Sequence, residues 1–363
     1  MPDPVSIRLA IAGGGTGGHL FPGLAVAELA RTTGAAEEVV FFGAERGIEF
    51  RVVPKAGFPL VAEKVHGIAG GGPLAAARSI LEMLSATMRA SRELRSRRID
   101  VVIGLGGYAS APAVLAARLR GIPVVLLEQN REPGISNRAL GYLATRICTS
   151  FESTSSFPAS KVVCTGNPLR AGFDERPPYG EHRDLLLVFG GSGGARSLNH
   201  AVVAALAELS RSRKLPPVLH QVGHAFVDEI RGQYAKAGVD ADVVPFIDDM
   251  RSAYARARLA ICRSGATSIA ELIATGTPAI LIPLATSAGG HQLENARTLE
   301  NAGAARVVLD DQKCATSLVP TLGGLLPDTM TLTSMADRAA ALGRPGAAAR
   351  VLQIVTELAR NRR

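Results

Sequence analysis

Tryptophan is absent from this chain of 363 residues, and only 4% of the residues are aromatic. Proteins that bind single-stranded nucleic acid stack its bases on aromatic side chains, so the composition gives little support to such a partner. The net charge is nevertheless +8, from 40 Lys and Arg against 32 Asp and Glu. This excess favours an anionic partner, either a phosphorylated small molecule or an acidic membrane surface, and we expect no nucleic acid.

Cysteine is scarce as well, and its four residues are too scattered for a C-x-x-C zinc pair or a disulfide framework. We expect buried apolar thiols at Cys148, Cys164, Cys262 and Cys314. No Asp-x-Asp pair suits a diphosphate-bound metal, and the adjacent Asp248 and Asp249 are expected to begin a helix. The sequence therefore predicts no metal site and no cofactor.

A long unbroken hydrophobic run is also missing. The longest uncharged stretch, residues 272–293, contains Pro278, Pro283 and three glycines, which is typical of a helix end, a turn and a strand rather than a membrane span. No secretory signal is recognisable, because the glycines from Gly13 onward interrupt the first apolar stretch too early. We therefore expect a cytoplasmic protein whose contact with a membrane is peripheral.

Short β-branched segments alternate with helical ones along the chain, which is the pattern of parallel βαβ units. Strands are predicted at residues 7–12, 39–42, 60–65, 101–103, 124–127, 146–149, 162–164, 185–189, 218–221, 243–245, 259–262, 279–282 and 306–308. Helices are predicted at 22–31, with Pro22 as the first helical residue, at 73–97 and at 347–360.

The pattern restarts after a loop rich in Pro, Gly and charge at residues 170–184. We therefore predict an α/β fold with two doubly wound domains, residues 1–166 and 167–345. The helix within residues 346–363 is expected to pack back on the first domain. Ligands bind at the carboxyl ends of the strands in such sheets, so two facing domains would place the site in the cleft between them.

Two glycine turns each follow a strand and precede a helix: "GGGTGGH" at residues 13–19 and "GGSGGARS" at 190–197. Bare amides at such a place favour an anion, although the same turn also occurs merely as tight packing. Neither turn has the Lys-Ser/Thr of a P-loop, and the second strand ends in "FFG" (41–43) without an acid for a ribose, so NAD is disfavoured. His19 can act as a general base on a substrate hydroxyl, or it can simply lie exposed at the helix start.

A third strand-to-helix turn reads "CRSGATSIAEL". Ser268 and Glu271 have the spacing of a capping box, in which Glu271 returns to the backbone of Ser268 and has only a structural role. The alternative is that a phosphate binds at the helix N-terminus while Glu271 accepts both hydroxyls of a ribose. The residues alone favour capping.

Polar residues also stand at two strand ends. In "LEQNREPG", Glu128, Gln129 and Asn130 follow an apolar strand, and unpaired buried polar groups are costly, so this position favours a site. In "GGHQLEN", His291 and Gln292 could bind sugar hydroxyls, and a polar loop with a helix cap is the alternative.

The segment 73–98 mixes Ile, Leu and Met residues with six arginines. A basic helix with an exposed apolar patch could rest on an anionic bilayer. An ordinary packed helix with a solvated basic end is the alternative, and the sequence alone favours it.

The ordered set of these stretches resembles the MurG family of peripheral membrane glycosyltransferases. The resemblance spans nearly the full chain and rests on "GGTGGH-FPGLA", "GGYASAP", "EQN-PG-SN", "GNPLR", "GGSGGA", "FIDDM", "CRSGATSIAE" and "HQ--NA". It implies the GT-B architecture, with two Rossmann-like domains facing across a cleft. It also implies inverting transfer of N-acetylglucosamine from UDP-GlcNAc to the C4 hydroxyl of lipid-linked N-acetylmuramyl-pentapeptide during peptidoglycan synthesis, at the cytoplasmic face of the inner membrane.

The resemblance also implies roles for individual residues. The second domain would bind UDP-GlcNAc, and the first would meet the lipid-linked acceptor and an anionic membrane surface. Ile247 would contact uracil through its backbone, Glu271 would bind the ribose, and Gln292 with Asn130 would contact the GlcNAc. The acceptor side would have His19 as the catalytic base, with Tyr108 and Glu128. The further residues implied at the donor are Thr16, Gly17, Gly18, Arg170, Ser192, Ala266, Thr267 and Ser268.

Two other functions stay open at this point. A UDP-GlcNAc 2-epimerase of similar GT-B shape would need neither a lipid acceptor nor a membrane patch. A UDP-sugar-binding module would bind the nucleotide sugar without turnover.

Overall fold

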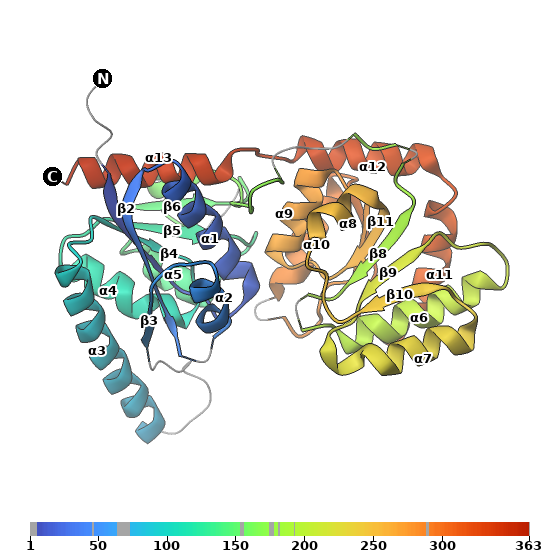
Figure 1. Ribbon diagram of the computed structural model, residues 1–363, viewed down its shortest axis with the longest axis horizontal. Coiled ribbons are helices and arrows are strands. Elements are labelled where there is room, and N and C mark those ends of the chain that lie inside the picture. Colours follow the sequence, from blue (N-terminus) through green and yellow to red (C-terminus); the bar gives the residue numbers. More distant parts are fainter. Residues whose placement is uncertain are drawn as a thin grey trace. The chain divides into compact units, whose positions relative to one another are not determined.

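The computed structural model describes residues 6–45, 47–63, 73–152, 156–173, 178–180, 182–191, 193–287 and 290–362, except for the side chains of residues 73–77. It divides into two compact units, each with its own sheet and helices (Figure 1). Unit 1 comprises Met1–Ala171 and Gly346–Arg363, and unit 2 comprises Gly172–Pro345. The division thus falls slightly later in the chain than the boundary after residue 166 that the sequence predicts.

Unit 1 contains parallel strands separated by helices. The strands are β1 (Ile7–Ala12), β2 (Ala36–Ala44), β3 (Leu60–Glu63), β4 (Val101–Gly104), β5 (Val124–Glu128), β6 (Arg146–Thr149) and β7 (Val162–Cys164). They form one sheet in the order β3-β2-β1-β4-β5-β6-β7. The helices are α1 (Gly17–Thr32), α2 (Glu49–Lys55), α3 (Pro73–Ser96), α4 (Ala111–Leu119), α5 (Ile135–Gly141) and α13 (Ala347–Arg360), with 3-10 turns η1 (Tyr108–Ser110) and η2 (Ala159–Lys161).

Both faces of this sheet are covered, as an all-parallel sheet requires, so its central strands are apolar on both sides. On one face Leu9 packs in a buried cluster with Leu24 of α1 and Val355 of α13. On the other face Val102 packs with Leu94 of α3. The last helix of the chain, drawn in red beside α1 in Figure 1, therefore belongs to the core of unit 1.

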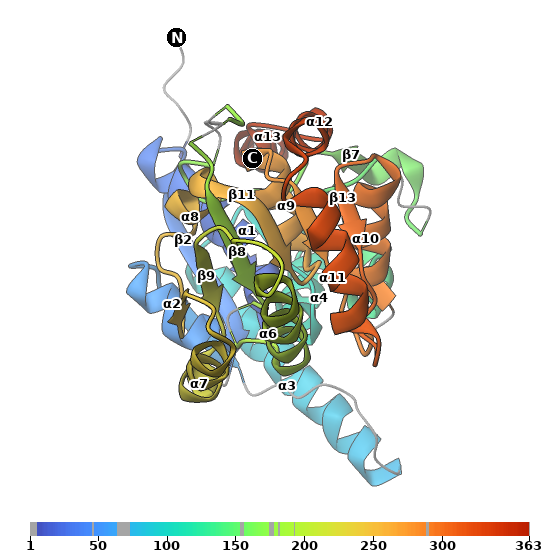
Figure 2. The ribbon, with the colours of Figure 1, turned by 90° about the vertical axis from the view of Figure 1, so that its right-hand side faces the viewer.

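Unit 2 repeats the arrangement. Its strands are β8 (Leu185–Phe189), β9 (Val218–Gln221), β10 (Ala241–Val244), β11 (Ala257–Cys262), β12 (Ala279–Leu281) and β13 (Ala305–Val307), in the sheet order β10-β9-β8-β11-β12-β13. Its helices are α6 (Arg196–Ser210), α7 (Val227–Ala237), α8 (Met250–Arg256), α9 (Ala266–Thr275), α10 (His291–Asn301), α11 (Cys314–Leu325) and α12 (Thr329–Ala341), with the 3-10 turn η3 (His224–Phe226). Figure 2 shows α6, α7, α10 and α11 around this sheet.

The order of the strands places a switch point in each sheet. β1 lies between β2 and β4, and β8 lies between β9 and β11, so consecutive crossovers leave these strands in opposite directions. Ligands of doubly wound sheets bind at the carboxyl ends of the strands at this point. Both glycine turns follow these first strands, β1 and β8. The predicted α/β fold with two doubly wound domains is confirmed.

Most predicted elements are also confirmed, but one helix start is wrong. The strands at 7–12, 146–149, 162–164, 185–189 and 218–221 and the helix at 347–360 have the predicted bounds. Pro22, however, lies inside α1, which begins at Gly17. The carbonyl of Thr16 already accepts a hydrogen bond from Leu20 N at 3.1 Å, so the helix starts within the glycine turn. All four cysteines are free, and Cys164 is only half-buried where a buried thiol was expected.

Candidate functional site

The first glycine turn packs directly against the turn that follows β4. Gly13 and Gly14 have φ values of +128° and +154°, which side chains other than glycine rarely adopt. A Cβ on Gly13 would lie 2.8 Å from the carbonyl oxygen of Gly106, and one on Gly107 would lie 3.5 Å from the carbonyl oxygen of Gly14. Two backbone segments at the switch point therefore meet without side chains between them.

His19 lies in the first turn of α1, three residues after the N-cap residue Thr16. Its Nδ1 is 3.0 Å from Oγ1 of Thr16, and the residue is half-buried. When Nδ1 carries the proton and donates to Thr16, Nε2 is the basic nitrogen of the ring. In that tautomer the ring could accept a proton at Nε2, beside the carboxyl end of β1.

Glu128 is the centre of a buried polar cluster at the end of β5. Its Oε1 accepts hydrogen bonds from the backbone N and Nδ2 of Asn130, at 2.9 and 3.3 Å, and its Oε2 accepts one from Asn137 Nδ2 at 2.9 Å. Burial raises the pKa of Glu128, and these amide donors partly oppose the rise. The carboxylate thus holds Asn130 at the site, while neighbouring Gln129 donates to the carbonyl of Leu105 at 3.3 Å.

Two further predicted residues of unit 1 are more exposed. Tyr108 begins η1, directly after Gly106 and Gly107, and is 42% exposed. The guanidinium of Arg170 lies 5.1 Å from the ring centre of Phe21, in a cation–π contact. A Cβ on Gly17 would lie 2.9 Å from the same ring, so Phe21 connects Arg170 with the glycine turn.

The second glycine turn borders a cavity of about 570 Å³ in unit 2. Its described lining residues, which include no acid, are Gly190, Gly194, Ala195, Arg196, Ser197, His200, Arg263, Leu284 and Gln292. Arg263 is held there by Asp310, at 2.8 Å, and by Ser197 Oγ, at 2.7 Å. The basic lining suits an anion such as a diphosphate. The predicted donor residue Ser192 lies outside the described residues.

The predicted capping box at the third turn is wrong. Helix α9 begins at Ala266, and its N-cap is Gly265, which has no side chain to accept hydrogen bonds. Ser268 is therefore an interior residue of the first turn, together with Thr267. The carboxylate of Glu271 is buried and accepts a hydrogen bond from the hydroxyl of Tyr254 at 3.1 Å. The turn thus presents helix amides and a fixed carboxylate, which suits a phosphate and a ribose.

Two glutamines hold loops of unit 2 in place at the carboxyl end of its sheet. Gln221 at the end of β9 donates to the carbonyl of Gly191 at 2.8 Å and accepts from the backbone N of Ile247 at 3.3 Å. A ligand contact through the backbone of Ile247 would therefore use its carbonyl. Gln292 lies in α10 and accepts from the backbone N of Leu284 at 3.0 Å. His291, singled out in the same stretch, is the first residue of α10.

Several buried polar residues of the site were not singled out from the sequence. Glu49 hydrogen-bonds the first glycine turn, Asn137 holds Glu128, and Tyr254 holds Glu271. Asn137 belongs to the stretch "EQN-PG-SN", so the sequence indicates its motif but not its hydrogen bond to Glu128. Asp249 caps α8 by accepting from Ser252 N at 3.0 Å, which confirms the predicted helix start.

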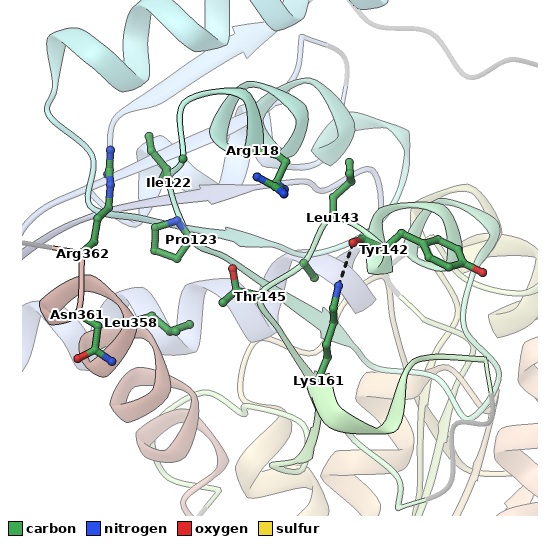
Figure 3. Close-up of a pocket in the computed structure, with 12 residues that line it drawn as sticks. Arg118, Ile122, Pro123, Tyr142, Leu143, Thr145, Lys161, Leu358, Asn361 and Arg362 are labelled. Atoms are coloured by element: carbon green, nitrogen blue, oxygen red, sulfur yellow. Dashed lines mark hydrogen bonds between the residues drawn. The ribbon is translucent and has the colours of Figure 1, made fainter.

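A second cavity, of about 430 Å³, lies in unit 1, at the end of the sheet opposite to the first glycine turn. Pro123 and Thr145, which immediately precede β5 and β6, line it together with Arg118 and Lys161 (Figure 3). The Nζ of Lys161 donates to the carbonyl of Tyr142 at 2.9 Å. This cavity lies at the amino ends of the strands and contains none of the predicted site residues.

The described residues contain neither a metal-ligand cluster nor a membrane-spanning helix. Across the described ranges, no group of three or more His, Cys, Asp and Glu side chains is placed to hold a metal ion. In the part of the chain that the structure describes, every helix is too short or too polar to cross a bilayer.

Comparison with known proteins places both units in one family. Residues 9–149 match the glycosyltransferase family 28 N-terminal domain, and residues 185–351 match the glycosyltransferase family 28 C-terminal domain. The chain is 43% identical over 350 residues to the UDP-N-acetylglucosamine–N-acetylmuramyl-(pentapeptide) pyrophosphoryl-undecaprenol N-acetylglucosamine transferase of Syntrophotalea carbinolica, which covers 96% of this chain and 98% of that protein.

Two further proteins agree with this match. The protein of the same name from Myxococcus xanthus is 43% identical over 356 residues, covering 97% of this chain and 93% of that protein. The crystal structure of Acinetobacter baumannii MurG has a TM-score of 0.79 at 31% identity, covering 97% of this chain and 99% of that one. The two units are thus the Rossmann-like domains of a GT-B protein. The chain belongs to glycosyltransferase family 28, and within it to the MurG family of N-acetylglucosamine transferases.

Proposed function

We propose that this chain transfers N-acetylglucosamine from UDP-GlcNAc to the C4 hydroxyl of undecaprenyl-pyrophosphoryl-N-acetylmuramyl-pentapeptide. The observation that carries the proposal is the similarity over nearly the whole chain to transferases whose names state this donor and acceptor. The polar groups at both switch points support it, because each reactant needs a binding site.

Unit 2 would bind the donor. The amides at the start of α9, at Ala266, Thr267 and Ser268, and the second glycine turn with Arg263 are suited to the diphosphate. Each carboxylate oxygen has more than one acceptor position, so Glu271 can keep Tyr254 and also accept the hydroxyls of the ribose. The carbonyl of Ile247 would meet uracil, and Gln292 and Ser192 would meet the sugar and phosphates.

Unit 1 would bind the acceptor and start the reaction. The C4 oxygen attacks the anomeric carbon as His19 takes its proton, so a C–O bond forms on one face of the sugar. The bond to UDP breaks on the other face, and UDP leaves with the electron pair. Thr16 orients His19, Tyr108 and Glu128 lie on the acceptor side, and Asn130, fixed by Glu128, would contact the GlcNAc. Arg170 and the amides of Gly17 and Gly18 would complete the donor side.

We also propose a peripheral position at the cytoplasmic face of an anionic membrane, and helix α3 supports the membrane contact. Its buried face carries Ala86, Ala90 and Leu94, whereas Leu84 and Met88 are 54% and 57% exposed. Ile80, Leu81, Arg78, Arg89, Arg92 and Arg95 are exposed on the same helix. Figures 1 and 2 both show the first half of α3 projecting from the rest of unit 1. Apolar side chains among arginines are the composition that interfacial helices use on acidic lipid.

One assay tests the proposal. The protein is incubated with UDP-GlcNAc in the presence and absence of the lipid-linked muramyl-pentapeptide, and UDP release and the identity of the sugar are followed. Acceptor-dependent release of UDP supports the transferase. Conversion of the nucleotide sugar without acceptor would instead identify an epimerase, and binding without either reaction a non-catalytic module.

A further inference from the structure

The first glycine turn has the sequence of a phosphate cradle, yet one of its amides is already used within the protein. The backbone N of Gly15 donates to Oε2 of Glu49 at 2.8 Å, and the backbone N of Ala44 donates to Oε1 of the same carboxylate at 2.9 Å. Glu49 is the first residue of α2 and is completely buried. A carboxylate of the chain itself therefore lies against the inner side of the turn.

Three glycines make the space for this carboxylate. A Cβ placed on Gly14, Gly43 or Gly47 would overlap the side chain of Glu49. Gly14 belongs to the turn after β1, Gly43 to the end of β2, and Gly47 to the loop before α2. Segments from three parts of the unit are thus shaped around one side chain, and both of its oxygens accept backbone amides, as a deprotonated acid can.

A short path connects Glu49 to the candidate base. Gly15, which the carboxylate holds, is followed directly by Thr16. The carbonyl of Thr16 accepts from His19 N at 3.3 Å, and Oγ1 of Thr16 lies 3.0 Å from Nδ1 of His19. The position of the Gly15 peptide therefore determines where the imidazole ring stands.

We propose that Glu49 is a positioning residue for the transfer reaction: its carboxylate fills the anion position of the first glycine turn and fixes Thr16 and His19 for removal of the acceptor proton. This inference rests on the proposed function, since it assigns the proton transfer to His19.

The Glu49→Ala variant tests the proposal in the assay with donor and lipid-linked acceptor. We expect kcat to fall about tenfold or more, because the Gly15 and Ala44 amides lose a charged acceptor, while the Kd for UDP-GlcNAc stays within about twofold. Formate at high concentration should enter the vacated space and restore part of kcat. The matched control is Glu63→Ala, which removes another buried carboxylate of unit 1 and should leave kcat unaltered and indifferent to formate.

A second readout does not depend on turnover. The ring resonances of His19, assigned with His19→Ala, should shift in Glu49→Ala and return towards the parent position with formate. Glu49→Gln, which keeps the size of the side chain but loses one acceptor oxygen, should give the same shift and serves if the Ala variant does not fold. Unchanged resonances of His19 overturn the proposal, as does a kcat within about threefold of the parent or a parallel loss of donor affinity. If the parent itself lacks acceptor-dependent transfer, the proposed function fails, while the resonances still report on Glu49.

Discussion

The hydroxyl of Tyr254 donates to Oε2 of Glu271 at 3.1 Å, and both side chains are buried in unit 2. Tyr254 is itself fixed by an edge-to-face contact with Phe189, with ring centres 5.8 Å apart. The carboxylate of Glu271, for which we propose a ribose contact, is thereby held in one orientation. Preorganised groups of this kind reduce the loss of conformational entropy that occurs on binding.

Removing that hydroxyl should weaken the donor complex. In Tyr254→Phe, Glu271 keeps its charge but loses a fixed orientation, so we expect the KM for UDP-GlcNAc to rise about tenfold with little change in kcat, as for one hydrogen bond to a charged group. Steady-state kinetics at saturating acceptor measures both constants. Tyr234→Phe removes another buried hydroxyl, which lies 2.8 Å from His220 Nδ1, and should lower stability while leaving KM alone. Equal KM values in the parent and Tyr254→Phe would exclude the orienting role.

Replacing His19 tests the general base. Removal of such a base typically costs about 10² to 10⁴ in rate, so His19→Ala should lose at least about a hundredfold in kcat while keeping its affinity for UDP-GlcNAc. Turnover at saturating substrates and donor titration by calorimetry give the two quantities. His224→Ala, an exposed histidine of η3, is the control and should behave as the parent. Turnover of His19→Ala within about threefold of the parent would remove His19 from this role.

Glu63 should lower the free energy of unfolding as the pH rises, whereas an acid with a depressed pKa would raise it. Burial raises its pKa from 4.5 to about 7, and the charge of Arg89 offsets only part of that rise. An acid that holds its proton more tightly in the folded state stabilises below its unfolded pKa, and this contribution is lost as the pH rises towards 7. Relative to Glu63→Gln, which resembles the protonated acid, the parent should therefore lose about 3 kcal/mol of unfolding free energy between pH 4.5 and pH 8.

Urea unfolding of both proteins at several pH values measures this difference. Other titrating groups cancel when the two curves are subtracted, because the variants differ at one site only. A difference that stays constant with pH, or one that grows in favour of the parent, would contradict the burial-raised pKa of Glu63.

The exposed face of α3 predicts binding to acidic membranes. Leu84→Glu with Met88→Glu replaces two exposed apolar side chains by charges of the same sign as the lipid, and should reduce sedimentation with phosphatidylglycerol vesicles about tenfold or more. Met330→Glu changes a methionine that is 85% exposed on α12 of unit 2 and is the matched control. Binding of the double variant equal to that of the control would place the membrane contact elsewhere.

The fold and the positions of the site could be predicted from the sequence because both depend on local pattern. Strands such as 185–189 are short apolar runs, and the stretches after them are candidate site segments because parallel strands end at one edge of the sheet. The partners of the polar residues depend on contacts distant in sequence. Glu49 is 34 residues from Gly15, and no periodicity relates the two.

The misassigned cap shows a second limit. The spacing of Ser268 and Glu271 fits a capping box, yet residues three apart also share one face inside a helix. Because the helix begins at Ala266, Ser268 and Glu271 are three apart as two interior helix residues, not as a capping box. The contact of Glu271 with Tyr254 depends on the fold and could not be predicted from this spacing. Pro22 was misplaced for a similar reason, because the glycine turn before it is already helical from Gly17.

The return of α13 to unit 1 has a consequence for how the protein is made. Unit 2 is one continuous segment, Gly172–Pro345, whereas unit 1 needs both ends of the chain. Arg350 in α13 donates to the carbonyl of Thr165, and Val355 fills the core beside β1. During synthesis on the ribosome, unit 2 has all its residues before unit 1 does. The half that carries His19 and Glu49 therefore completes its core only after α13 has left the exit tunnel.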